Sequence, residues 1–342
     1  MNVLALESSC DETAIAVVKD GKSLVNLVAS QHLLHERFGG VVPELASRRH
    51  VEIITPLLRE ALSEAHLTMN EIEGVAATYG PGLVGALLVG LCTAKGIAMA
   101  KKIPFRGVHH IEGHIIAALL EHASLPYPHI VLVVSGGHTH LYQVKAFGDY
   151  HLLGATRDDA AGEAFDKVAK LLDLGFPGGP ALDALSQHGD AHAFRFPFPH
   201  FDDPHSLEFS FSGIKTAVML LVRKLTPLSA RMKANIAASF QHAVVETLMK
   251  QTREAVKRTH AHAVVISGGV AANRLLRKRI TEEALLMHIP CFIPSPHFCT
   301  DNAAMIGYVG ERYLRLGQVS PLTLNAVAHE EIGISSCLSS HS

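Results

Sequence analysis

The hydrophobic pattern of the chain changes repeatedly between short apolar runs and longer segments with an apolar residue every three or four positions. The short runs have the length of buried strands, at residues 3–6, 14–18, 75–78, 129–134, 141–144 and 263–266. The periodic segments predict helices near residues 51–65, 83–100, 158–170, 230–260 and 302–316. Alternation of the two kinds predicts an α/β fold with helices on the sheet faces.

Two strand–turn–strand units stand out within this pattern. The first turns at residues 7–13 and the second at Ser135–His138. Each could be an ordinary hairpin, but two such units far apart in one chain suggest two similar domains facing each other across a cleft. Further glycine turns occur at Gly178-Gly179 and Gly268-Gly269. Backbone amides in such turns can approach an anion. We therefore predict that the turns at Ser135–His138, Gly178-Gly179 and Gly268-Gly269 cradle one nucleotide.

A histidine pair precedes an apolar segment with helical spacing at residues 115–120. At about 100° per residue, His110 and His114 lie roughly 40° apart on one helix face. Two imidazoles in this arrangement can hold a divalent metal, and Asp301 could complete a two-histidine, one-carboxylate set. The alternative remains open, because a chain with 23 histidines contains such a pair by chance.

Composition and net charge limit the classes of protein to which the chain can belong. With 342 residues, 48% of them hydrophobic, and a net charge of −2, the chain can form two cores and does not coat nucleic acid by bulk charge. Five cysteines without a Cys-x-x-Cys pair indicate reduced thiols, and Cys10 is interpreted as inert. Residues 1–6 lack a basic leader and residues 83–100 are interrupted by glycines and a lysine. We therefore expect a cytoplasmic protein without a membrane span.

Three further features have competing interpretations. Asp166 and Asp183 flank the Gly178-Gly179 turn and could bind sugar hydroxyls, although solvated carboxylates would look the same. The aromatics of residues 194–211 could stack on bases, but we favour anchors that plug the core. The basic cluster at residues 274–279 could attract RNA phosphates or be a solvated helix face.

Ordered motifs along the chain resemble the bacterial TsaD (formerly Gcp) family of tRNA N(6)-adenosine threonylcarbamoyltransferases. The resemblance covers about residues 1–325 and rests on Glu7–Thr13, Gly39–Glu44, His109–His114, Ser135–Thr139, Glu163–Asp166, Gly178–Pro180, Phe211–Thr216, Gly268–Asn273 and Thr300–Asn302. Two departures are Ser267, where a further glycine is common, and the tail beyond about residue 328.

The resemblance implies an actin-like (ASKHA) two-lobed fold with duplicated mixed sheets, flanking helices and a central nucleotide cleft. We expect lobe I to comprise residues 1–108, joined by a C-terminal helix within 302–325. Lobe II would comprise residues 109–301, and residues 329–342 would form a loose tail.

The resemblance also implies an activity. The threonylcarbamoyl group of threonylcarbamoyl-AMP would pass to the N(6) amine of the adenosine 3′-adjacent to the anticodon in ANN-decoding tRNAs, releasing AMP. Implied partners are the tRNA anticodon loop, a TsaC enzyme that makes the adenylate, a TsaB-like paralogue and a TsaE-like ATPase.

Site residues follow from the same resemblance. His110, His114 and Asp301 would bind one divalent metal, usually Fe²⁺, with Zn²⁺ as an alternative. The substrate-binding positions would be Val134, Ser135, Gly136, Gly137, His138, Asp166, Gly179, Asp183 and Asn273. A general base is not obvious. Asp11 and Glu12 are candidates only because their turn should face the cleft.

Three other functions compete with this hypothesis. An actin-fold small-molecule kinase or ATPase would share the nucleotide loops but would not need two histidines, since magnesium prefers oxygen ligands. A zinc metallopeptidase usually carries its glutamate next to the first histidine, whereas Glu112 is expected about 200° round the helix from His110. A non-catalytic scaffold would need neither glycine turns nor metal ligands.

Overall fold

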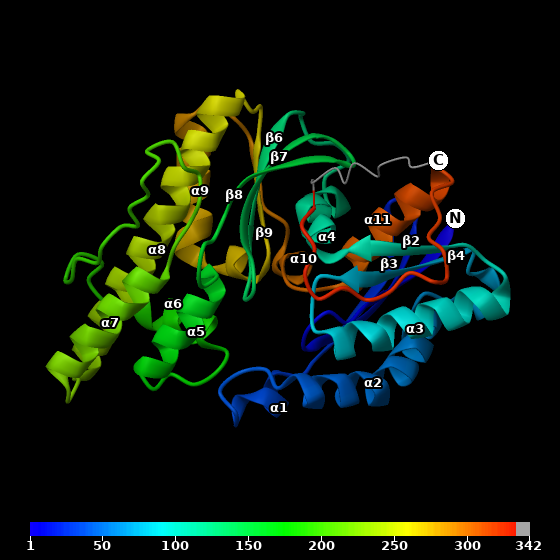
Figure 1. Ribbon diagram of the computed structural model, residues 1–342, viewed down its shortest axis with the longest axis horizontal. Coiled ribbons are helices and arrows are strands. Elements are labelled where there is room, and N and C mark those ends of the chain that lie inside the picture. Colours follow the sequence, from blue (N-terminus) through cyan, green and yellow to red (C-terminus); the bar gives the residue numbers. More distant parts are fainter. Residues whose placement is uncertain (333–342) are drawn as a thin grey trace.

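Two five-stranded mixed sheets form the framework of the protein in a computed structural model that describes residues 1–332 (Figure 1). The first sheet has the order β3-β2-β1-β4-β5. Its strands are β1 (Asn2–Glu7), β2 (Glu12–Lys19), β3 (Lys22–Ser30), β4 (Gly74–Gly80) and β5 (Phe105–His109). The second has the order β10-β9-β6-β7-β8. Its strands are β6 (His129–Val134), β7 (Thr139–Ala146), β8 (Asp149–Ala155), β9 (Val264–Ser267) and β10 (Cys291–Phe292).

The two sheets share one topology. In each, the first strand pairs antiparallel with the second and parallel with the fourth, the second pairs antiparallel with the third, and the fourth pairs parallel with the fifth. The same connectivity used twice is a structural duplication. The predicted α/β, two-lobed, actin-like fold is confirmed.

Strand β1 shows how the sequence builds the layers of the first lobe. Its side chains alternate between faces, as the period of a strand requires. Leu4 and Leu6 face α2 (Pro43–Glu64) and α3 (Val84–Lys101), whereas Val3 and Ala5 face α11 (Ala303–Arg315). Both faces of the sheet are therefore covered by helices.

The second lobe is covered in the same way. Ile130, Leu132 and Val134 of β6 face the helices of one side, which are α5 (Ala161–Leu171), α6 (Gly178–Ser186), α7 (Ser212–Leu225), α8 (Ala230–Thr259) and α9 (Arg274–Leu286). Val131 and Val133 share a core with α4 (His110–Ile116) and α11. These two helices lie between the sheets, so their residues contact both lobes.

Several elements differ from the sequence predictions. The helix expected at residues 51–65 begins at Pro43, a residue that suits a first helical turn. Gly178-Gly179 was expected in a turn, but both residues lie in the first turn of α6. Strands β3, β5, β8 and β10 were not predicted, and neither was α7. Polar residues interrupt β3 and β8, β5 contains Gly107 and β10 has two residues, so none shows a clear apolar run.

One helix within residues 1–332, α3, is long and apolar enough to cross a membrane by length and composition. It packs on β4, β1 and α2, and Leu87, Leu91 and Ala94 are fully buried there. The apolar residues of α3 thus include those with which the helix packs against the first sheet.

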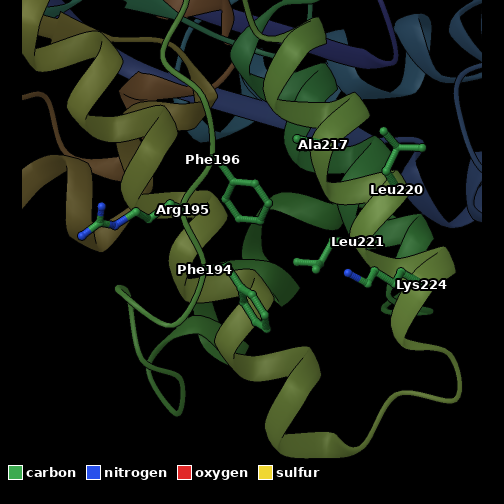
Figure 2. A pocket seen from close by; sticks show the side chains of 7 residues that line it. All are labelled: Phe194, Arg195, Phe196, Ala217, Leu220, Leu221 and Lys224. Atoms are coloured by element: carbon green, nitrogen blue, oxygen red, sulfur yellow. The ribbon is translucent and has the colours of Figure 1, made fainter.

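The Phe- and Pro-rich loop at 194–211 runs beside α7 and α8. Phe209 and Phe211 are fully buried, which supports the interpretation as core anchors, although Phe198 is exposed. A hollow of about 370 Å³ remains between the loop and α7 (Figure 2), lined by Phe194, Arg195, Phe196, Ala217, Leu220, Leu221 and Lys224.

The segment after α11 returns along the first lobe. Val327 N donates to Tyr79 O at 2.8 Å, and His109 Nε2 lies 3.1 Å from Glu330 O. Residues 329–332 of the expected loose tail thus end beside β5. Its remaining residues, 333–342, lie outside the described part of the chain.

Candidate metal centre

Helix α4 follows β5 directly and carries the histidine pair. His109 caps the helix, because its Nδ1 accepts a hydrogen bond from Ile111 N at 3.2 Å. All seven residues of α4 are buried. The His110 and His114 rings lie edge to face with their centroids 4.8 Å apart, so the predicted common face is present.

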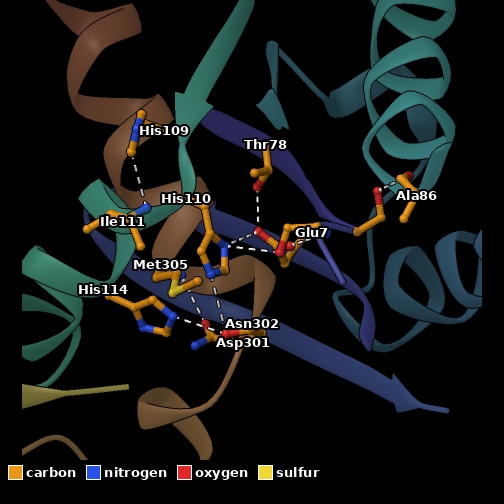
Figure 3. Close-up of polar contacts among 12 residues, drawn as sticks. Glu7, Thr78, Ala86, His109, His110, Ile111, His114, Asp301, Asn302 and Met305 are labelled. Atoms are coloured by element: carbon orange, nitrogen blue, oxygen red, sulfur yellow. Dashed lines mark hydrogen bonds and ion pairs between the residues drawn. The ribbon is translucent and has the colours of Figure 1, made fainter. Parts of the chain in front are cut away.

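Asp301 reaches these histidines from a distant part of the sequence. It lies between α10 (Pro296–Cys299) and α11, where Asn302 caps α11 by accepting from Met305 N at 3.0 Å. Asp301 Oδ1 is 3.0 Å from His114 Nε2 and 3.5 Å from His110 Nε2 (Figure 3). One donor atom from each of the three residues lies within 4.8 Å of the others. The structure therefore brings the three predicted ligands together.

Glu7 is part of this site, although the sequence analysis did not single it out. It is 1% exposed at the end of β1, and its Oε2 lies 3.1 Å from His110 Nδ1. Ser9 N and Thr78 Oγ1 donate to the same carboxylate at 2.5 Å each. This arrangement places a hydrogen on His110 Nδ1 and leaves Nε2 free as the ligand atom.

Charge and burial oppose each other in this cluster. Burial lowers the pKa of His110, but the carboxylates of Asp301 and Glu7 outweigh burial and raise it to about 9. Burial raises the pKa of Asp301, and the facing His110 and His114 outweigh it and hold that pKa well below its usual range. The two carboxylates thus favour positive charge beside the imidazoles. A divalent cation would supply that charge, so the donor set fits a metal.

Glu112 occupies the opposite side of α4. Its Oε1 accepts from Tyr150 OH at 3.1 Å and from Tyr313 OH at 2.6 Å. The carboxylate therefore points away from the histidine pair, as expected from its position in the helix. A His-Glu-x-x-His arrangement, with the glutamate beside the metal, is not formed here.

The turn at residues 10–12 adjoins the site. Burial, followed by the charge of Asp11, raises the pKa of Glu12 well above its usual range. Burial also raises the pKa of the Cys10 thiol, in agreement with an inert cysteine. Burial, and to a lesser extent the charge of Asp11, raises the pKa of Asp166 on α5.

The Ser135–His138 turn comes to the metal centre from the second sheet. Ser135 N donates to His138 O at 2.8 Å and His138 N donates to Ser135 Oγ at 3.1 Å, which closes the turn. The His138 and His110 ring centroids are 6.2 Å apart. A methyl group on Gly136 or Gly137 would contact nothing within 4 Å, so this backbone is open to a ligand.

Other predicted substrate residues form two pairs. Asp166 Oδ1 accepts from Gly178 N at 2.8 Å, next to Gly179. Asn273 Nδ2 donates to Asp183 Oδ1 at 3.3 Å, and to Gln241 Oε1 at 2.9 Å. Asp183 and Asn273 are 90 residues apart in sequence. Gln241 was not predicted, because a buried glutamine in a long helix leaves no recognisable motif.

The basic cluster at residues 274–279 has two kinds of member. Arg277 donates to Ala271 O and Pro294 O, and Arg279 pairs with Glu246. Only Arg274 and Lys278 are strongly exposed, at 69% and 71%. Arg277 and Arg279 thus make contacts within the protein, whereas Arg274 and Lys278 lie on an exposed helix face.

Comparisons with known proteins agree on one family. The model of the family described as "TsaD: tRNA N6-adenosine threonylcarbamoyltransferase" matches residues 22–308. A tRNA N6-adenosine threonylcarbamoyltransferase of Syntrophotalea carbinolica is 51% identical over 328 residues, covering 95% of each chain. The enzyme of the same name from Clostridium novyi is 47% identical over 335 residues, covering 97% of this chain and 98% of its own.

Solved structures extend the likeness to more distant proteins. HypF of T. kodakarensis superposes with a TM-score of 0.65 at 15% identity, over 93% of this chain and 49% of its own. Component A of the Acidaminococcus fermentans (R)-2-hydroxyglutaryl-CoA dehydratase gives a TM-score of 0.54 at 14% identity, over 92% of this chain and 99% of its own. The chain spans about half of the HypF chain, and at such identities these matches concern the fold alone.

Proposed function

The chain belongs to the TsaD family of tRNA N6-adenosine threonylcarbamoyltransferases, and from this premise we propose that its donor is threonylcarbamoyl-AMP and that AMP is released. The protein is a transferase that modifies tRNA. We propose as acceptor the N(6) amine of the adenosine 3′-adjacent to the anticodon in ANN-decoding tRNAs. The convergence of His110, His114 and Asp301 beside the open Ser135–His138 turn supports this proposal most strongly.

We propose that the three ligands hold one divalent metal. Two imidazoles and one carboxylate with open positions favour Fe²⁺, with Zn²⁺ as the alternative, over magnesium. When bound, the cation would supply positive charge and Lewis acidity to the oxygens of the donor. Glu7 supports this assignment, because it orients His110 with Nε2 toward Asp301.

The residues of the second lobe are proposed to bind the adenylate part of the donor. Open amides of Gly136 and Gly137, with Val134, Ser135 and His138 around them, would hold the phosphate. The remaining predicted positions would fix ribose and base. They are Asp166, Gly179, Asp183 and Asn273.

The proposed reaction is an acyl transfer. The adenosine amine attacks the carbonyl carbon of the mixed anhydride, a new C–N bond forms, and the C–O bond to phosphate breaks. AMP leaves with the bonding electron pair, and the amine gives its proton to a base. Of the two candidates we favour Asp11, because burial and the neighbouring charge of Asp11 disfavour the ionised form of Glu12 and raise its pKa.

The acceptor base is proposed to enter from the anticodon loop, where unpaired bases can be splayed out. We further propose that a TsaC enzyme supplies the adenylate, that a TsaB-like paralogue and a TsaE-like ATPase assist, and that the reaction is cytoplasmic. The kinase alternative would leave the His110–His114 pair without a task. The peptidase alternative lacks a glutamate of α4 beside the histidine pair, because Glu112 points toward Tyr150 and Tyr313.

A reconstituted reaction tests the proposal. The protein, its partners, threonylcarbamoyl-AMP and unmodified tRNA should yield threonylcarbamoyladenosine, measured by mass spectrometry of the digested nucleosides. His114→Ala should lose bound metal and product together, whereas the matched variant His122→Ala, outside the site, should retain both. Full activity of His114→Ala without metal would remove the metal from the mechanism.

A further inference from the structure

Helix α4 is held on two sides, by Asp301 just before α11 and by Tyr313 within α11. On the ligand side, His114 Nε2 meets Asp301 Oδ1 at 3.0 Å, and Asp301 precedes α11 by two residues. On the opposite side, Glu112 Oε1 accepts from Tyr313 OH at 2.6 Å. Asp301 and Tyr313 are twelve positions apart, and the helical part between them, residues 303–313, is about 15 Å long.

A close contact between the two helices lies between these ends. A methyl group on Gly113 would lie 2.8 Å from Met305 Cγ and 3.1 Å from Ile306 Cδ1, so the glycine allows α4 to lie directly on α11. Glu112 and Gly113 thus contact α11 itself, and His114 contacts Asp301 just before its start. Rotation of α4 about its axis would break the polar contacts on either side.

A second hydrogen bond to the same carboxylate oxygen comes from the other lobe. Tyr150 OH, on β8, donates to Glu112 Oε1 at 3.1 Å. Glu112 and Tyr150 are both 5% exposed, and the Arg106 guanidinium lies 4.0 Å from the centroid of the Tyr313 ring. A carboxylate that is buried so deeply needs its donors, because a buried polar group left without a hydrogen bond is strongly disfavoured.

We propose that Glu112 is a positioning residue that fixes the rotation of α4 on α11 and thereby aligns His110 and His114 with Asp301. This inference rests on the proposed metal site. It follows that the two tyrosines are not equivalent. Tyr313 belongs to the helix that follows Asp301, so its hydroxyl sets the alignment of the ligands, whereas Tyr150 only adds stability to Glu112.

Two isosteric variants of the full chain separate these roles. Tyr313→Phe and Tyr150→Phe each remove one hydroxyl from the same carboxylate and leave the ring in place. Affinity for Zn²⁺, and for Fe²⁺ under nitrogen, would be measured by competition with a chelator, and thermal unfolding would be measured in EDTA. Tyr313→Phe should lower metal affinity roughly three- to tenfold. This loss is no larger than the smallest typical loss for a residue that is hydrogen-bonded directly to a metal ligand. Tyr150→Phe should bind metal as the wild type does.

Glu112 itself provides the conservative comparison. Glu112→Gln keeps an oxygen that can accept from both hydroxyls, so metal affinity should stay close to that of the wild type. Glu112→Ala should lose more affinity than Tyr313→Phe. A purely structural role would instead lower the unfolding temperature of both tyrosine variants and leave their metal affinities alike.

Each outcome decides the question. Equal metal affinities of the two tyrosine variants, whether both unchanged or both reduced, would overturn the inference. A loss of metal affinity in Glu112→Gln as large as in Glu112→Ala would also overturn the inference, because an acceptor oxygen at this position would then not suffice to hold α4. A wild-type protein that binds neither metal would overturn the metal centre as well, and so is distinguishable from failure of this inference alone.

Discussion

Replacement of Glu7 by glutamine should weaken metal binding although the side chain keeps its size. In the structure the Glu7 carboxylate accepts from Ser9 N on one oxygen and from Thr78 Oγ1 and His110 Nδ1 on the other. An amide cannot satisfy this set, because one end of it is a donor. If the amide nitrogen faces His110, Nδ1 must accept and Nε2 must carry the hydrogen, which blocks the ligand atom. If the amide nitrogen faces Ser9, two donors oppose each other.

The magnitude follows from the burial of this group. Loss of an outer hydrogen-bond partner of a metal ligand typically lowers affinity about 10–100-fold, which corresponds to about 1.4–2.7 kcal/mol. Glu7 is 1% exposed, so water cannot take its place. We therefore expect a loss within that range for Zn²⁺ or Fe²⁺, measured by chelator competition.

A matched control is available on the surface of the same lobe. Glu52 is 63% exposed and pairs with the neighbouring Arg49 at 2.8 Å, so Glu52→Gln should leave metal affinity unchanged. Product formation by Glu7→Gln should fall in parallel with its metal content. Wild-type affinity in Glu7→Gln, with the fold intact, would refute the assigned tautomer of His110.

Three further changes have calculable outcomes. Gly268→Ala should destabilise the protein by about 1–3 kcal/mol in urea unfolding, because φ is +89° and a methyl group would lie 2.4 Å from Val134 O; a smaller loss would mean that the backbone relaxes. Burial lowers the pKa of His140 to about 4. As the pH falls, His140 therefore takes up a proton in the unfolded chain before it does so in the folded protein. The free energy of unfolding should fall by about 1–2 kcal/mol between pH 7 and pH 5. His140→Gln should reduce the pH dependence of stability by that amount in unfolding experiments, and an unchanged slope would contradict the assignment. Asp11→Asn should reduce single-turnover transfer far more than Glu12→Gln, and the reverse order would exchange their roles.

The elements that the sequence predicted well are those with an unbroken apolar pattern. Strands β1 and β6 and helices α3, α8 and α11 lie close to their expected positions, because each buries a continuous face. Strands β3 and β8 are at or near a sheet edge and carry polar residues on one side, so their period was hidden. Local pattern therefore predicted the core strands and missed the outer ones.

The candidate site divides in a similar way. His110 and His114 could be paired from sequence because the spacing of a helix is fixed. Asp301 was assigned by type and by the family resemblance. Glu7 was missed as a partner of His110, since 103 residues separate the two and no local rule joins them. Tyr313, 201 residues from Glu112, was missed for the same reason.

One measurement tests the central claim most directly, that the His110–His114–Asp301 centre serves transfer to tRNA. Cells depleted of this protein would be complemented with the wild type, His114→Ala or the control His122→Ala, whose side chain lies outside the metal site against Phe292. Their tRNA nucleosides would be quantified by mass spectrometry. The account predicts that threonylcarbamoyladenosine disappears on depletion, returns with the wild type and the control, and stays absent with His114→Ala. Full restoration by His114→Ala, or undiminished threonylcarbamoyladenosine in depleted cells, would contradict it.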